Sequence, residues 1–187
     1  MPKKLPIVKE PNLMLREKAR DVVVADIGSK KIQNLIADMK ATLKETPDGV
    51  GLAAPQVGES LRLFIISDEA EEIDRTNTTK RDSRGNKIPN YIKPYPIRDW
   101  HYYAFINPHV VTKSRKKVDG PEGCLSVPGT FGTIKRQEKI IVQALDEHGK
   151  KFTRGASRFF ARVMQHELDH LEGVLFIDHA THMIKAE

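Results

Sequence analysis

The chain has 187 residues, of which 39% are hydrophobic and 30% are charged, and its net charge is +6 with a sequence pI near 9.4. This composition predicts a globular protein of one domain over residues 1–187 and excludes the disordered and fibrous classes. No apolar run approaches the roughly 18 to 20 residues that cross a bilayer, so we expect no membrane partner. The basic residues are scattered and no nucleic-acid motif is present, which favours a solvated basic surface and leaves ribosome contact open.

The first third of the chain carries two helix signals and one strand signal. Residues 12–18 follow Pro11 and predict a short helical turn. Residues 29–46 space their apolar side chains as an amphipathic helix does, and Pro47 ends this N-terminal helix. Residues 61–67 (LRLFIIS) are apolar and rich in β-branched side chains, which predicts a buried strand.

A long polar stretch follows at residues 68–99. It begins acidic, becomes basic, and carries Pro89, Pro94 and Pro96. Connections of this length are unusual inside a compact domain. The stretch therefore predicts a surface insertion, and a small hairpin is one structure that it could hold.

The second half of the chain is rich in strand signals and ends in a helix. Strands are expected at residues 102–112, 131–136, 138–145 and 150–154. Residues 157–171 carry apolar side chains around most of a helical circumference, which predicts a buried helix with Gly173 as its left-handed cap. The fold class that follows is α+β, with mainly antiparallel β-sheets packed around this central C-terminal helix and with the N-terminal helix added.

The predicted C-terminal helix contains the sequence His-Glu-Leu-Asp-His at residues 166–170. Residues four apart lie on one face of a helix, so His166 and His170 can bind one metal ion together. Glu167 lies about 100° around the helix from His166, near enough to move a proton at a metal-bound water without being a ligand. Burial of these groups without partners would cost several kcal/mol. The motif therefore predicts a metal-dependent hydrolase.

A catalytic metal site of this kind needs a third protein ligand. Phe176 occupies the position at which metzincin proteases carry a third histidine, and neither glutamate that follows the motif is well placed. His179 and His182 lie in a tail without a strong structural signal. An upstream ligand is favoured, and Cys124 is the only thiol in the chain. Ligand softness and geometry by themselves favour zinc.

Cys124 also bears on the compartment. One cysteine cannot form an intramolecular disulfide, and a lone cysteine is most often a small buried hydrophobic residue. Residues 1–10 lack the apolar stretch of a secretory signal. We therefore expect a cytoplasmic protein, with an organellar address left open in case a transit peptide has been removed.

Three segments resemble the three motifs of peptide deformylases, in the family's order. They are Gly-Val-Gly-Leu-Ala-Ala-Pro-Gln-Val-Gly at residues 49–58, Glu-Gly-Cys-Leu-Ser at residues 122–126, and Gln-His-Glu-Leu-Asp-His-Leu at residues 165–171. The similarity extends from about residue 11 to residue 178. The chain departs from the compact members at residues 68–99, where its connection is longer.

The resemblance implies an enzyme that removes the formyl group from the N-terminal formyl-methionine of nascent polypeptides. It also implies that Cys124, His166 and His170 bind one divalent metal ion and that water takes the fourth position. The family's native metal is usually ferrous iron (Fe²⁺), which zinc, nickel or cobalt replaces.

The resemblance also assigns catalytic roles. A water held by the metal would attack the formyl carbon, with Glu167 accepting its proton and later delivering it to the leaving amine. The side-chain amide of Gln56 and the backbone N–H of Leu125 would stabilise the developing oxyanion.

Substrate binding is expected to involve backbone groups and an apolar pocket. Val50, Gly51 and Gly123 would line the peptide channel, the glycines through backbone bonding to an extended substrate. Val163 and Phe131 are expected near the pocket for the methionine side chain.

Two other functions stay open on the sequence alone. An HExxH endopeptidase would use the same helix to cleave internal peptide bonds. A non-catalytic binding module, directed to the ribosome, would use the metal structurally and would need a fourth protein ligand, for which His179 is the candidate.

Overall fold

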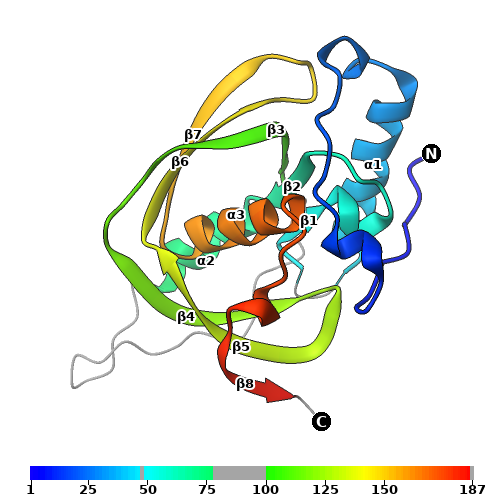
Figure 1. The fold of residues 1–187 in the computed structure, drawn as a ribbon. Coiled ribbons are helices and arrows are strands. Elements are labelled where there is room, and N and C mark those ends of the chain that lie inside the picture. The colour runs from blue at the N-terminus through cyan, green and yellow to red at the C-terminus, as the bar shows by residue number, and fades with distance from the viewer. Residues whose placement is uncertain (47–48, 78–99, 186–187) are drawn as a thin grey trace.

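The computed structural model describes residues 1–46, 49–77 and 100–185 of the chain (Figure 1). Within them two antiparallel sheets form. The five-stranded sheet has the order β1-β2-β3-β6-β7, with β1 at Gly51–Ala53, β2 at Leu63–Ser67, β3 at Tyr102–Lys113, β6 at Lys139–Leu145 and β7 at Lys151–Ser157. The three-stranded sheet has the order β4-β5-β8, with β4 at Lys117–Cys124, β5 at Val127–Gln137 and β8 at Thr181–Lys185. All pairings between these strands are antiparallel, as the sequence predicts.

Three α-helices accompany the sheets in the described part of the chain: α1 at Lys30–Lys44, α2 at Glu69–Asn77 and α3 at Arg158–Leu171. Short 3-10 turns lie at Leu13–Arg16, Val24–Asp26, Ala54–Val57 and Phe176–Asp178. Helix α3 lies in the middle of the molecule and contacts strands of both sheets (Figure 1). None of the helices in the described ranges is both long and apolar enough to cross a membrane.

Strand β2 divides the core into two clusters, because its side chains alternate between the two faces of the sheet. Phe64 and Ile66 pack in the cluster that includes Met164 of α3, whereas Leu63 and Ile65 pack in the cluster that includes Met39 of α1. Every residue of β2 is buried. The uninterrupted apolar run of the sequence thus reflects a strand covered on both faces.

Helix α3 is held at both ends by recognisable turn chemistry. Phe160 and Met164 of the helix are buried against Val142 of β6. Gly173, just past the helix, has φ +73, the left-handed conformation that ends helices, as predicted. The helix therefore fixes its side chains against the sheet in a single orientation.

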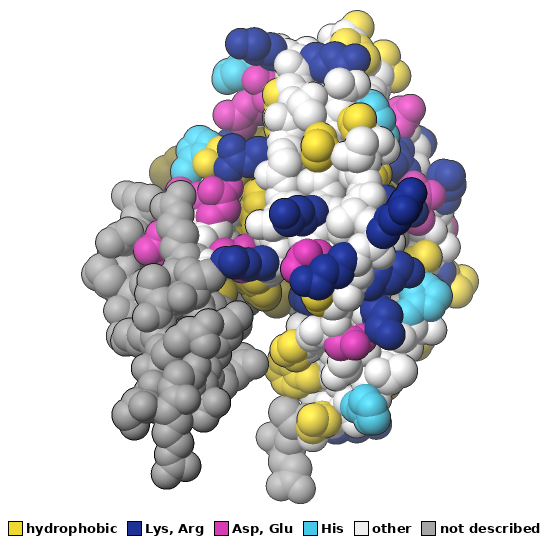
Figure 2. Space-filling model, turned by 90° about the vertical axis from the view of Figure 1, so that its left-hand side faces the viewer, with side chains coloured by type: hydrophobic (Ala, Val, Ile, Leu, Met, Phe, Trp, Pro, Cys, Tyr) yellow, Lys and Arg dark blue, Asp and Glu magenta, His cyan; other side chains and the backbone are white. Residues whose placement is uncertain are grey.

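Several sequence expectations need correction or extension. Residues 68–99 begin with α2, which contacts α3, so the start of this segment is a packed helix and not a loop or hairpin. Residues 78–99 of the expected insertion lie outside the described residues. The expected strand at 131–136 is the later part of the longer β5, and β1, β4 and β8 form where no strand was expected. Lys and Arg side chains are spread over the face in Figure 2, with Asp and Glu side chains among them.

Candidate active site

The candidate site lies where the β4–β5 hairpin, the segment around β1 and helix α3 come together. A pocket there is lined by residues of all three elements, among them Val50, Gly51, Gly123, Phe131 and Val163. All five were expected in the peptide channel or the methionine pocket. The walls are largely apolar, and the polar groups gather at one end.

Cys124, His166 and His170 lie together at that end. One ligand atom from each residue lies within 4.8 Å of those of the other two, and no other group of this kind occurs in the described part of the chain. The Sγ of Cys124 lies 3.3 Å from the Nε2 of His170. A thiol at the end of β4 thus meets two imidazoles one helical turn apart, because β4 runs past α3.

The donor set fits a divalent metal ion. The Nδ1 of His170 and the Oε2 of Glu167 are buried and have no hydrogen-bond partner among the described residues. Unpaired buried polar atoms cost free energy, so an ordered water at the Oε2 of Glu167 would complete this arrangement, whereas a cation would bind the Nε2 of His170, the nitrogen that lies near the Sγ of Cys124. Thiolate sulfur and imidazole nitrogen are ligands for zinc and for first-row transition metals.

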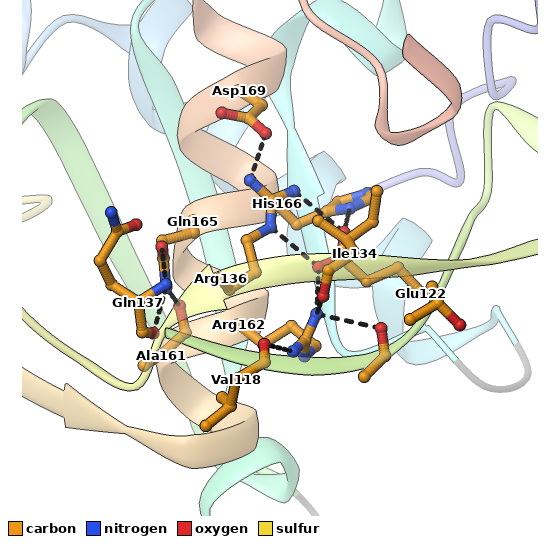
Figure 3. A network of polar contacts seen from close by, with 12 residues as sticks. Val118, Glu122, Ile134, Arg136, Gln137, Ala161, Arg162, Gln165, His166 and Asp169 are labelled. Atoms are coloured by element: carbon orange, nitrogen blue, oxygen red, sulfur yellow. Dashed lines mark hydrogen bonds and ion pairs between the residues drawn. The ribbon is translucent and has the colours of Figure 1, made fainter. Parts of the chain in front are cut away.

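Glu122 of β4 orients His166. One carboxylate oxygen lies 3.0 Å from the Nδ1 of His166, and the other accepts from Arg136 at 2.9 Å (Figure 3). Burial raises the pKa of Glu122, but Arg136 and His166 outweigh burial and lower it to about 2. An ionised carboxylate can only accept, so Nδ1 of His166 carries the proton and its Nε2 is left for the metal.

Two arginines balance the charge of Glu122 inside the protein. Arg162 of α3 donates to a Glu122 oxygen at 2.9 Å, and Arg136 of β5 also donates to Asp169 of α3 (Figure 3). Desolvation lowers the pKa of Arg136, but its bonds to Glu122 and Asp169 hold it far above the ordinary value. Two positive and two negative side chains therefore form one closed network around His166.

Glu167 is buried beside the Cys124, His166 and His170 group and faces β1. An added Cβ on Gly51 would collide with its carboxylate, so Gly51 leaves the space that the carboxylate occupies. Burial raises the pKa of Glu167 to about 7, and the nearby His166 acts in the opposite direction. A carboxyl with such a pKa can both accept and release a proton near neutral pH.

The two histidines differ in their titration. Burial lowers the pKa of His166, but hydrogen bonds with Cys124 and Glu122 raise it well above 6.5. Burial lowers the pKa of His170 well below 6.5, and the charge of His166 acts in the same direction. These directions belong to the site without a bound cation, since a metal requires both imidazoles to be neutral.

Gln56 lies in the 3-10 turn after β1 and is 2% exposed. Its Oε1 accepts from the N–H of Ala53 at 2.8 Å, which turns its Nε2 toward the Sγ of Cys124 at 3.5 Å and the Oγ of Ser126 at 3.2 Å. Leu125 follows Cys124 in the turn between β4 and β5 and also lines the pocket. The structure thus brings both expected oxyanion donors to the same end of the pocket.

The alternative ligands lie elsewhere. Glu172 forms ion pairs with Arg62 and Lys18, whereas His179 and His182 are exposed near or within β8. His179 does not join the metal-ligand group among the described residues, so the fourth protein ligand of a purely structural site is not found there.

Sequence reasoning missed the arginine network around Glu122. Arg136, Arg162 and Asp169 have no local motif that links them, because they come from β5 and from two turns of α3. The only signal was the presence of an arginine in an otherwise apolar helix. A charged residue at such a position requires a buried partner.

The family model of polypeptide deformylases matches residues 4–186 of the chain. The chain belongs to the peptide deformylase family. Members of this family are metal-dependent hydrolases that remove N-terminal formyl groups. The chain is therefore an enzyme of N-terminal protein processing, as the three sequence motifs imply.

Named relatives and solved structures agree with this placement. The chain is 40% identical to a peptide deformylase of Symbiobacterium thermophilum over 96% of its own length and 68% of the relative's. It is 40% identical to peptide deformylase 2 of Nostoc, over 95% and 86% of the two chains. A Met-Ala-Ser-bound class I type b peptide deformylase from Acinetobacter baumannii superposes with a TM-score of 0.75 at 32% identity, covering 96% of this deformylase and 99% of that chain.

Proposed function

We propose that this deformylase hydrolyses the formyl group of formyl-methionyl peptides and that Glu167 is its proton carrier. The observation that carries the proposal is the meeting of Cys124, His166 and His170 next to the buried Glu167, at the polar end of an apolar pocket. The reaction adds water to the formyl amide and yields formate and a free N-terminal amine.

Cys124, His166 and His170 would hold one divalent cation, which we propose to be Fe²⁺, with Zn²⁺, Ni²⁺ and Co²⁺ as replacements. The cation would supply Lewis-acid chemistry at the formyl carbonyl and at the attacking water. Glu122 supports this assignment because it fixes which nitrogen of His166 points away from the network.

Glu167 would take the proton of the attacking water and deliver it to the amine as the C–N bond breaks. Its carboxyl is buried, and in the site without a cation burial raises its pKa to about 7, which supports a group that exchanges protons. It occupies the space that Gly51 leaves, so its position relative to the pocket is set by the packing of β1 against α3.

The amide of Gln56 and the N–H of Leu125 would donate to the oxygen on which negative charge develops. Gln56 is suited to this because its own oxygen is already held by Ala53, which fixes the direction of its NH₂ group. Preorganised donors stabilise a transition state without reorganising during the reaction.

The apolar pocket would take the methionine side chain, and backbone groups at Val50, Gly51 and Gly123 would align the peptide. Phe131 lies so close to Gly123 that an added Cβ would come within 2.8 Å of its ring. A carbonyl carbon that bears only hydrogen would enter this narrow site, whereas a larger acyl group would be rejected by contact. The Met-Ala-Ser peptide bound to the Acinetobacter baumannii relative is a product of this kind.

Formate release tests the proposal. Anaerobically purified protein, loaded in turn with Fe²⁺, Ni²⁺ or Co²⁺, should release formate from a formyl-Met tripeptide and leave casein intact. Glu167→Gln should keep its metal and lose about 10²- to 10⁴-fold in kcat. No formate release with any of the three metals would overturn the proposed activity, and near-normal turnover by Glu167→Gln would overturn the role of this carboxyl.

A further inference from the structure

The first turn of α3 is capped from another helix. Ser157 occupies the N-cap position, where a serine side chain usually accepts from a backbone N–H, yet it forms no such bond. Instead the two carboxylate oxygens of Asp74, on α2, accept from the N–H groups of Phe159 and Phe160 at 3.0 Å each. The cap of the metal-binding helix is thus supplied by the segment that the sequence marks as an insertion.

Asp74 is held in place by a second contact of the same helix. Glu71, one turn earlier on α2, forms an ion pair with Arg154 of β7. The guanidinium of Arg154 lies 5.7 Å from the ring centre of Phe160 and 5.2 Å from that of Tyr103. Helix α2 is therefore fixed against β7 and α3 at two points. Asp74 has a defined position, and its hydrogen bonds fix the first turn of α3 relative to α2.

The start of α3 needs such an external contact. Arg158, its first residue, has φ +52, a left-handed conformation that is unfavourable for a residue with a side chain. Burial raises the pKa of the Asp74 carboxyl, against the opposite effect of the amides of Phe160 and Phe159. The two N–H bonds to Asp74 thus hold a helix end whose first residue is in an unfavourable conformation.

The capped turn forms part of the substrate pocket. Phe159, whose N–H Asp74 binds, lines the pocket, and so do Arg162 and Val163 of the next turn. His166 lies seven residues further, about 10 Å along the helix axis. A shift of the first turn would therefore move the pocket wall far more than it would move the metal-ligating residues.

We propose that Asp74 is a positioning residue for the substrate pocket, which it shapes by holding the first turn of α3 and with it the side chain of Phe159. The proposal rests on the proposed function, because the pocket is taken to bind the side chain of the first residue of the substrate. Asp74 acts through α3 and touches no reacting atom.

The expected effect is on substrate selection. Asp74→Ala should raise KM for a formyl-Met tripeptide by about tenfold, the scale of a lost helix cap, while kcat and metal content change less than about twofold. It should also lower the ratio of kcat/KM for the formyl-Met tripeptide to kcat/KM for the formyl-Leu and formyl-Phe tripeptides. Asp74→Asn keeps one carbonyl acceptor and should lie between Asp74→Ala and the unmodified enzyme.

Ser157→Ala is the matched control. It alters the residue at the ordinary cap position of the same helix end, where the side chain makes no capping bond. It should leave KM and the substrate preference unchanged. If both variants behave alike, or if Asp74→Ala lowers kcat and metal content with KM unchanged, the proposed role of Asp74 is wrong.

A binding measurement separates this proposal from the proposed activity. Calorimetry of the tripeptide Met-Ala-Ser on metal-loaded protein reports on the pocket without turnover. Asp74→Ala should weaken this binding by about tenfold relative to Ser157→Ala, and far-UV circular dichroism should stay unchanged. Absence of formate release from the unmodified protein would overturn the activity alone, whereas equal peptide affinity of the two variants would overturn the role of Asp74.

Discussion

At the scale of single residues, Glu122 links the proposed metal ligand His166 to the rest of the protein. Its two oxygens serve His166, Arg136 and Arg162, and its side chain is 4% exposed. A carboxylate behind a metal-binding histidine fixes the tautomer and the orientation of the ring, and its loss usually weakens metal binding by a factor of about 10 to 100.

Glu122→Gln should therefore weaken metal binding by about 10- to 100-fold. The amide is nearly isosteric, but it leaves Arg136 and Arg162 without the negative charge that they share. Competition with a chromogenic chelator measures the change.

Results

Sequence analysis

The chain has 187 residues, of which 39% are hydrophobic and 30% are charged, and its net charge is +6 with a sequence pI near 9.4. This composition predicts a globular protein of one domain over residues 1–187 and excludes the disordered and fibrous classes. No apolar run approaches the roughly 18 to 20 residues that cross a bilayer, so we expect no membrane partner. The basic residues are scattered and no nucleic-acid motif is present, which favours a solvated basic surface and leaves ribosome contact open.

The first third of the chain carries two helix signals and one strand signal. Residues 12–18 follow Pro11 and predict a short helical turn. Residues 29–46 space their apolar side chains as an amphipathic helix does, and Pro47 ends this N-terminal helix. Residues 61–67 (LRLFIIS) are apolar and rich in β-branched side chains, which predicts a buried strand.

A long polar stretch follows at residues 68–99. It begins acidic, becomes basic, and carries Pro89, Pro94 and Pro96. Connections of this length are unusual inside a compact domain. The stretch therefore predicts a surface insertion, and a small hairpin is one structure that it could hold.

The second half of the chain is rich in strand signals and ends in a helix. Strands are expected at residues 102–112, 131–136, 138–145 and 150–154. Residues 157–171 carry apolar side chains around most of a helical circumference, which predicts a buried helix with Gly173 as its left-handed cap. The fold class that follows is α+β, with mainly antiparallel β-sheets packed around this central C-terminal helix and with the N-terminal helix added.

The predicted C-terminal helix contains the sequence His-Glu-Leu-Asp-His at residues 166–170. Residues four apart lie on one face of a helix, so His166 and His170 can bind one metal ion together. Glu167 lies about 100° around the helix from His166, near enough to move a proton at a metal-bound water without being a ligand. Burial of these groups without partners would cost several kcal/mol. The motif therefore predicts a metal-dependent hydrolase.

A catalytic metal site of this kind needs a third protein ligand. Phe176 occupies the position at which metzincin proteases carry a third histidine, and neither glutamate that follows the motif is well placed. His179 and His182 lie in a tail without a strong structural signal. An upstream ligand is favoured, and Cys124 is the only thiol in the chain. Ligand softness and geometry by themselves favour zinc.

Cys124 also bears on the compartment. One cysteine cannot form an intramolecular disulfide, and a lone cysteine is most often a small buried hydrophobic residue. Residues 1–10 lack the apolar stretch of a secretory signal. We therefore expect a cytoplasmic protein, with an organellar address left open in case a transit peptide has been removed.

Three segments resemble the three motifs of peptide deformylases, in the family's order. They are Gly-Val-Gly-Leu-Ala-Ala-Pro-Gln-Val-Gly at residues 49–58, Glu-Gly-Cys-Leu-Ser at residues 122–126, and Gln-His-Glu-Leu-Asp-His-Leu at residues 165–171. The similarity extends from about residue 11 to residue 178. The chain departs from the compact members at residues 68–99, where its connection is longer.

The resemblance implies an enzyme that removes the formyl group from the N-terminal formyl-methionine of nascent polypeptides. It also implies that Cys124, His166 and His170 bind one divalent metal ion and that water takes the fourth position. The family's native metal is usually ferrous iron (Fe²⁺), which zinc, nickel or cobalt replaces.

The resemblance also assigns catalytic roles. A water held by the metal would attack the formyl carbon, with Glu167 accepting its proton and later delivering it to the leaving amine. The side-chain amide of Gln56 and the backbone N–H of Leu125 would stabilise the developing oxyanion.

Substrate binding is expected to involve backbone groups and an apolar pocket. Val50, Gly51 and Gly123 would line the peptide channel, the glycines through backbone bonding to an extended substrate. Val163 and Phe131 are expected near the pocket for the methionine side chain.

Two other functions stay open on the sequence alone. An HExxH endopeptidase would use the same helix to cleave internal peptide bonds. A non-catalytic binding module, directed to the ribosome, would use the metal structurally and would need a fourth protein ligand, for which His179 is the candidate.

Overall fold

The computed structural model describes residues 1–46, 49–77 and 100–185 of the chain (Figure 1). Within these ranges there are two antiparallel sheets. The five-stranded sheet has the order β1-β2-β3-β6-β7, with β1 at Gly51–Ala53, β2 at Leu63–Ser67, β3 at Tyr102–Lys113, β6 at Lys139–Leu145 and β7 at Lys151–Ser157. The three-stranded sheet has the order β4-β5-β8, with β4 at Lys117–Cys124, β5 at Val127–Gln137 and β8 at Thr181–Lys185. All pairings between these strands are antiparallel, as the sequence predicts.

Three α-helices accompany the sheets in the described part of the chain: α1 at Lys30–Lys44, α2 at Glu69–Asn77 and α3 at Arg158–Leu171. Short 3-10 turns lie at Leu13–Arg16, Val24–Asp26, Ala54–Val57 and Phe176–Asp178. Helix α3 lies in the middle of the molecule and contacts strands of both sheets (Figure 1). None of the helices in the described ranges is both long and apolar enough to cross a membrane.

Strand β2 divides the core into two clusters, because its side chains alternate between the two faces of the sheet. Phe64 and Ile66 pack in the cluster that includes Met164 of α3, whereas Leu63 and Ile65 pack in the cluster that includes Met39 of α1. Every residue of β2 is buried. The uninterrupted apolar run of the sequence thus reflects a strand covered on both faces.

Helix α3 is packed along its length and ends at a glycine. Phe160 and Met164 of the helix share a buried cluster with Val142 of β6. Gly173, just past the helix, has φ +73, the left-handed conformation that ends helices, as predicted. The packing therefore fixes the side chains of α3 in one orientation relative to the sheet.

Several sequence expectations need correction or extension. Residues 68–99 begin with α2, which contacts α3, so the start of this segment is a packed helix and not a loop or hairpin. Residues 78–99 of the expected insertion lie outside the described residues. The expected strand at 131–136 is the later part of the longer β5, and β1, β4 and β8 form where no strand was expected. Lys and Arg side chains are spread over the face in Figure 2, with Asp and Glu side chains among them.

Candidate active site

The candidate site lies where the β4–β5 hairpin, the segment around β1 and helix α3 come together. A pocket there is lined by residues of all three elements, among them Val50, Gly51, Gly123, Phe131 and Val163. All five were expected in the peptide channel or in the methionine pocket. The lining is largely apolar, and it reaches the cysteine and the HExxH motif.

Cys124, His166 and His170 lie together beside this pocket. One ligand atom from each residue lies within 4.8 Å of those of the other two, and no other group of this kind occurs in the described part of the chain. The Sγ of Cys124 lies 3.3 Å from the Nε2 of His170. A thiol at the end of β4 thus meets two imidazoles that are one helical turn apart on α3.

The donor set fits a divalent metal ion. The Nδ1 of His170 and the Oε2 of Glu167 are buried and have no hydrogen-bond partner among the described residues. Unpaired buried polar atoms cost free energy, so an ordered water at the Oε2 of Glu167 would complete this arrangement, whereas a cation would bind the Nε2 of His170, the nitrogen that lies near the Sγ of Cys124. Thiolate sulfur and imidazole nitrogen are ligands for zinc and for other first-row transition metals.

Glu122 of β4 orients His166. One carboxylate oxygen lies 3.0 Å from the Nδ1 of His166, and the other accepts from Arg136 at 2.9 Å (Figure 3). Burial raises the pKa of Glu122, but Arg136 and His166 outweigh burial and lower it to about 2. An ionised carboxylate can only accept, so Nδ1 of His166 carries the proton and its Nε2 is left for the metal.

Two arginines balance the charge of Glu122 inside the protein. Arg162 of α3 donates to a Glu122 oxygen at 2.9 Å, and Arg136 of β5 also donates to Asp169 of α3 (Figure 3). Desolvation lowers the pKa of Arg136, but its bonds to Glu122 and Asp169 outweigh desolvation and raise it above the ordinary value. Two positive and two negative side chains therefore form one connected network next to His166.

Glu167 is buried beside the Cys124, His166 and His170 group and faces β1. An added Cβ on Gly51 would collide with its carboxylate, so Gly51 leaves the space that the carboxylate occupies. Burial raises the pKa of Glu167 to about 7, and the nearby His166 acts in the opposite direction. A carboxyl with such a pKa can both accept and release a proton near neutral pH.

The two histidines differ in their titration. Burial lowers the pKa of His166, but hydrogen bonds with Cys124 and Glu122 raise it well above 6.5. Burial lowers the pKa of His170 well below 6.5, and the charge of His166 acts in the same direction. These directions belong to the site without a bound cation, since a metal requires both imidazoles to be neutral.

Gln56 lies in the 3-10 turn after β1 and is 2% exposed. Its Oε1 accepts from the N–H of Ala53 at 2.8 Å, which turns its Nε2 toward the Sγ of Cys124 at 3.5 Å and the Oγ of Ser126 at 3.2 Å. Leu125 follows Cys124 in the turn between β4 and β5 and also lines the pocket. The structure thus brings both residues that were expected as oxyanion donors next to the cysteine.

The alternative ligands lie elsewhere. Glu172 forms ion pairs with Arg62 and Lys18, whereas His179 and His182 are exposed near or within β8. His179 does not join the metal-ligand group among the described residues, so the fourth protein ligand of a purely structural site is not found there.

Sequence reasoning missed the arginine network around Glu122. Arg136, Arg162 and Asp169 have no local motif that links them, because they come from β5 and from two turns of α3. The only signal is the presence of an arginine in an otherwise apolar part of the helix. A charged residue at such a position requires a buried partner.

The family model of polypeptide deformylases matches residues 4–186 of the chain. The chain belongs to the peptide deformylase family. Members of this family are metal-dependent hydrolases that remove N-terminal formyl groups. The chain is therefore an enzyme of N-terminal protein processing, as the three sequence motifs imply.

Relatives and solved structures agree with this placement. The chain is 40% identical to a peptide deformylase of Symbiobacterium thermophilum over 96% of its own length and 68% of the relative's. It is 40% identical to peptide deformylase 2 of Nostoc, over 95% and 86% of the two chains. A Met-Ala-Ser-bound class I type b peptide deformylase from Acinetobacter baumannii superposes with a TM-score of 0.75 at 32% identity, covering 96% of this deformylase and 99% of that chain.

Proposed function

We propose that this deformylase hydrolyses the formyl group of formyl-methionyl peptides and that Glu167 is its proton carrier. The observation that carries the proposal is the meeting of Cys124, His166 and His170 next to the buried Glu167, beside an apolar pocket. The reaction adds water to the formyl amide and yields formate and a free N-terminal amine.

Cys124, His166 and His170 would hold one divalent cation, which we propose to be Fe²⁺, with Zn²⁺, Ni²⁺ and Co²⁺ as replacements. The cation would supply Lewis-acid chemistry at the formyl carbonyl and at the attacking water. Glu122 supports this assignment because its bond to Nδ1 of His166 leaves Nε2 as the ligand atom.

Glu167 would take the proton of the attacking water and deliver it to the amine as the C–N bond breaks. Its carboxyl is buried, and in the site without a cation burial raises its pKa to about 7, which supports a group that exchanges protons. It occupies the space that Gly51 leaves, so its position relative to the pocket depends on the packing of β1 against α3.

The amide of Gln56 and the N–H of Leu125 would donate to the oxygen on which negative charge develops. Gln56 is suited to this because its own oxygen is already held by Ala53, which fixes the direction of its NH₂ group. Preorganised donors stabilise a transition state without reorganising during the reaction.

The apolar pocket would take the methionine side chain, and backbone groups at Val50, Gly51 and Gly123 would align the peptide. Phe131 lies so close to Gly123 that an added Cβ would come within 2.8 Å of its ring. A carbonyl carbon that bears only hydrogen would enter this narrow site, whereas a larger acyl group would be rejected by contact. The Met-Ala-Ser peptide bound to the Acinetobacter baumannii relative has the form of a deformylated product.

Formate release tests the proposal. Anaerobically purified protein, loaded in turn with Fe²⁺, Ni²⁺ or Co²⁺, should release formate from a formyl-Met tripeptide and leave casein intact. Glu167→Gln should keep its metal and lose about 10²- to 10⁴-fold in kcat. No formate release with any of the three metals would overturn the proposed activity, and near-normal turnover by Glu167→Gln would overturn the role of this carboxyl.

A further inference from the structure

The first turn of α3 is capped from another helix. Ser157 occupies the N-cap position, where a serine side chain usually accepts from a backbone N–H, yet it forms no such bond. Instead the two carboxylate oxygens of Asp74, on α2, accept from the N–H groups of Phe159 and Phe160 at 3.0 Å each. The cap of the helix that carries the HExxH motif is thus supplied by the segment that the sequence marks as an insertion.

Asp74 is held in place by a second contact of its own helix. Glu71, one turn earlier on α2, forms an ion pair with Arg154 of β7. The guanidinium of Arg154 lies 5.7 Å from the ring centre of Phe160 and 5.2 Å from that of Tyr103. Helix α2 is therefore fixed against β7 and α3 at two points. Asp74 has a defined position, and its hydrogen bonds fix the first turn of α3 relative to α2.

The start of α3 needs such an external contact. Arg158, its first residue, has φ +52, a left-handed conformation that is unfavourable for a residue with a side chain. Burial raises the pKa of the Asp74 carboxyl, against the opposite effect of the amides of Phe160 and Phe159. The two N–H bonds to Asp74 thus hold a helix end whose first residue is in an unfavourable conformation.

The capped turn forms part of the substrate pocket. Phe159, whose N–H Asp74 binds, lines the pocket, and so do Arg162 and Val163 of the next turn. His166 lies seven residues after Phe159, about 10 Å along the helix axis. A shift of the first turn would therefore move the pocket wall far more than it would move the metal-ligating residues.

We propose that Asp74 is a positioning residue for the substrate pocket, which it shapes by holding the first turn of α3 and with it the side chain of Phe159. The proposal rests on the proposed function, because the pocket is taken to bind the side chain of the first residue of the substrate. Asp74 acts through α3 and is not assigned any contact with the reacting atoms.

The expected effect is on substrate selection. Asp74→Ala should raise KM for a formyl-Met tripeptide by about tenfold, the scale of a lost helix cap, while kcat and metal content change less than about twofold. It should also lower the ratio of kcat/KM for the formyl-Met tripeptide to kcat/KM for the formyl-Leu and formyl-Phe tripeptides. Asp74→Asn keeps one carbonyl acceptor and should lie between Asp74→Ala and the unmodified enzyme.

Ser157→Ala is the matched control. It alters the residue at the ordinary cap position of the same helix end, where the side chain makes no capping bond. It should leave KM and the substrate preference unchanged. If both variants behave alike, or if Asp74→Ala lowers kcat and metal content with KM unchanged, the proposed role of Asp74 is wrong.

A binding measurement separates this proposal from the proposed activity. Calorimetry of the tripeptide Met-Ala-Ser on metal-loaded protein reports on the pocket without turnover. Asp74→Ala should weaken this binding by about tenfold relative to Ser157→Ala, with an unchanged far-UV circular dichroism spectrum. Absence of formate release from the unmodified protein would overturn the activity alone, whereas equal peptide affinity of the two variants would overturn the role of Asp74.

Discussion

At the scale of single residues, Glu122 links the proposed metal ligand His166 to the rest of the protein. Its two oxygens serve His166, Arg136 and Arg162, and its side chain is 4% exposed. A carboxylate behind a metal-binding histidine fixes the tautomer and the orientation of the ring. The metal affinity of the site should therefore depend on Glu122 although this residue is not a ligand.

Glu122→Gln should weaken metal binding by about 10- to 100-fold. The amide is nearly isosteric, but it leaves Arg136 and Arg162 without the negative charge that they share. Competition with a chromogenic chelator measures the change. Glu138→Gln is a suitable control, since Glu138 pairs with Lys116 at the surface. Equal affinity of the two variants would contradict the orienting role of Glu122.

Gly51 sets the position of Glu167 by having no side chain. Gly51→Ala would push a methyl group into the Glu167 carboxylate, so kcat should fall by about 10²-fold, the scale of a misplacement of about 1 Å. Metal content should stay the same, because neither residue is a proposed ligand. Formate release and elemental analysis measure the two effects. Gly155→Ala in β7, where an added Cβ meets nothing within 4 Å, should retain full activity.

At the scale of secondary-structure elements, Arg162 connects α3, β4 and β5. From α3 it donates to the backbone carbonyls of Val118 at 2.9 Å, Gly120 at 3.2 Å and Ile134 at 2.9 Å, which lie in β4 and β5 (Figure 3). One side chain therefore ties the helix with the two histidines to the hairpin with the cysteine. It is largely buried, so its loss would remove a donor from these carbonyls and would leave Glu122 with Arg136 as its one arginine partner.

Arg162→Met should lower the free energy of unfolding of the metal-free protein by about 3 kcal/mol or more, the usual effect of breaking a buried ion pair. Urea denaturation at fixed pH measures the loss. Lys135→Met replaces an exposed cation of β5 and should change stability by less than about 0.5 kcal/mol. A similar small change for Arg162→Met would mean that the hairpin is held to α3 by other contacts.

The elements differ in how far the sequence predicted them. Helices α1 and α3 and strands β2, β3, β6 and β7 were expected, because their apolar residues follow the period of a helix or form short apolar or alternating runs. Strand β4 was missed, since Gly120, Pro121 and Gly123 break any such pattern and the strand is formed by its pairing with β5. Helix α2 was missed because its first turn is acidic and its sequence has few apolar residues, and contacts with α3 and β7 hold it.

The site shows the same division. His166 and His170 could be chosen as metal ligands from their chemistry and spacing, whereas Cys124 was assigned as a ligand through the resemblance to peptide deformylases, and the three side chains do lie together. Arg162 and Asp74 could not be chosen, because their roles arise from contacts between segments that are far apart in the chain. Periodicity reports which face of an element is buried, and it carries no information on which distant charge will meet it.

At the scale of the whole molecule, the proposed metal site lies between the two sheets. Cys124 ends a strand of the three-stranded sheet, whereas His166 and His170 belong to the helix that packs on the five-stranded sheet. A cation bound by all three would therefore hold the sheets together through α3. Binding to the native state alone stabilises it by RT ln(1 + [L]/Kd), about 4.1 kcal/mol at a free metal concentration of 1,000 times Kd.

Removal of the metal should consequently lower Tm by roughly 8 to 16 °C, since about 1 kcal/mol shifts Tm by some 2 to 4 °C in a protein of this size. Scanning calorimetry before and after chelation, and after Co²⁺ is added back, measures the shift. Cys124→Ser should lose most of the metal-dependent part of Tm, whereas Glu167→Gln should keep it, because only the former residue is a proposed ligand. A Tm that does not respond to metal in the unmodified protein would contradict this bridging role, and a response lost in Glu167→Gln would make that carboxylate a ligand and not the proton carrier.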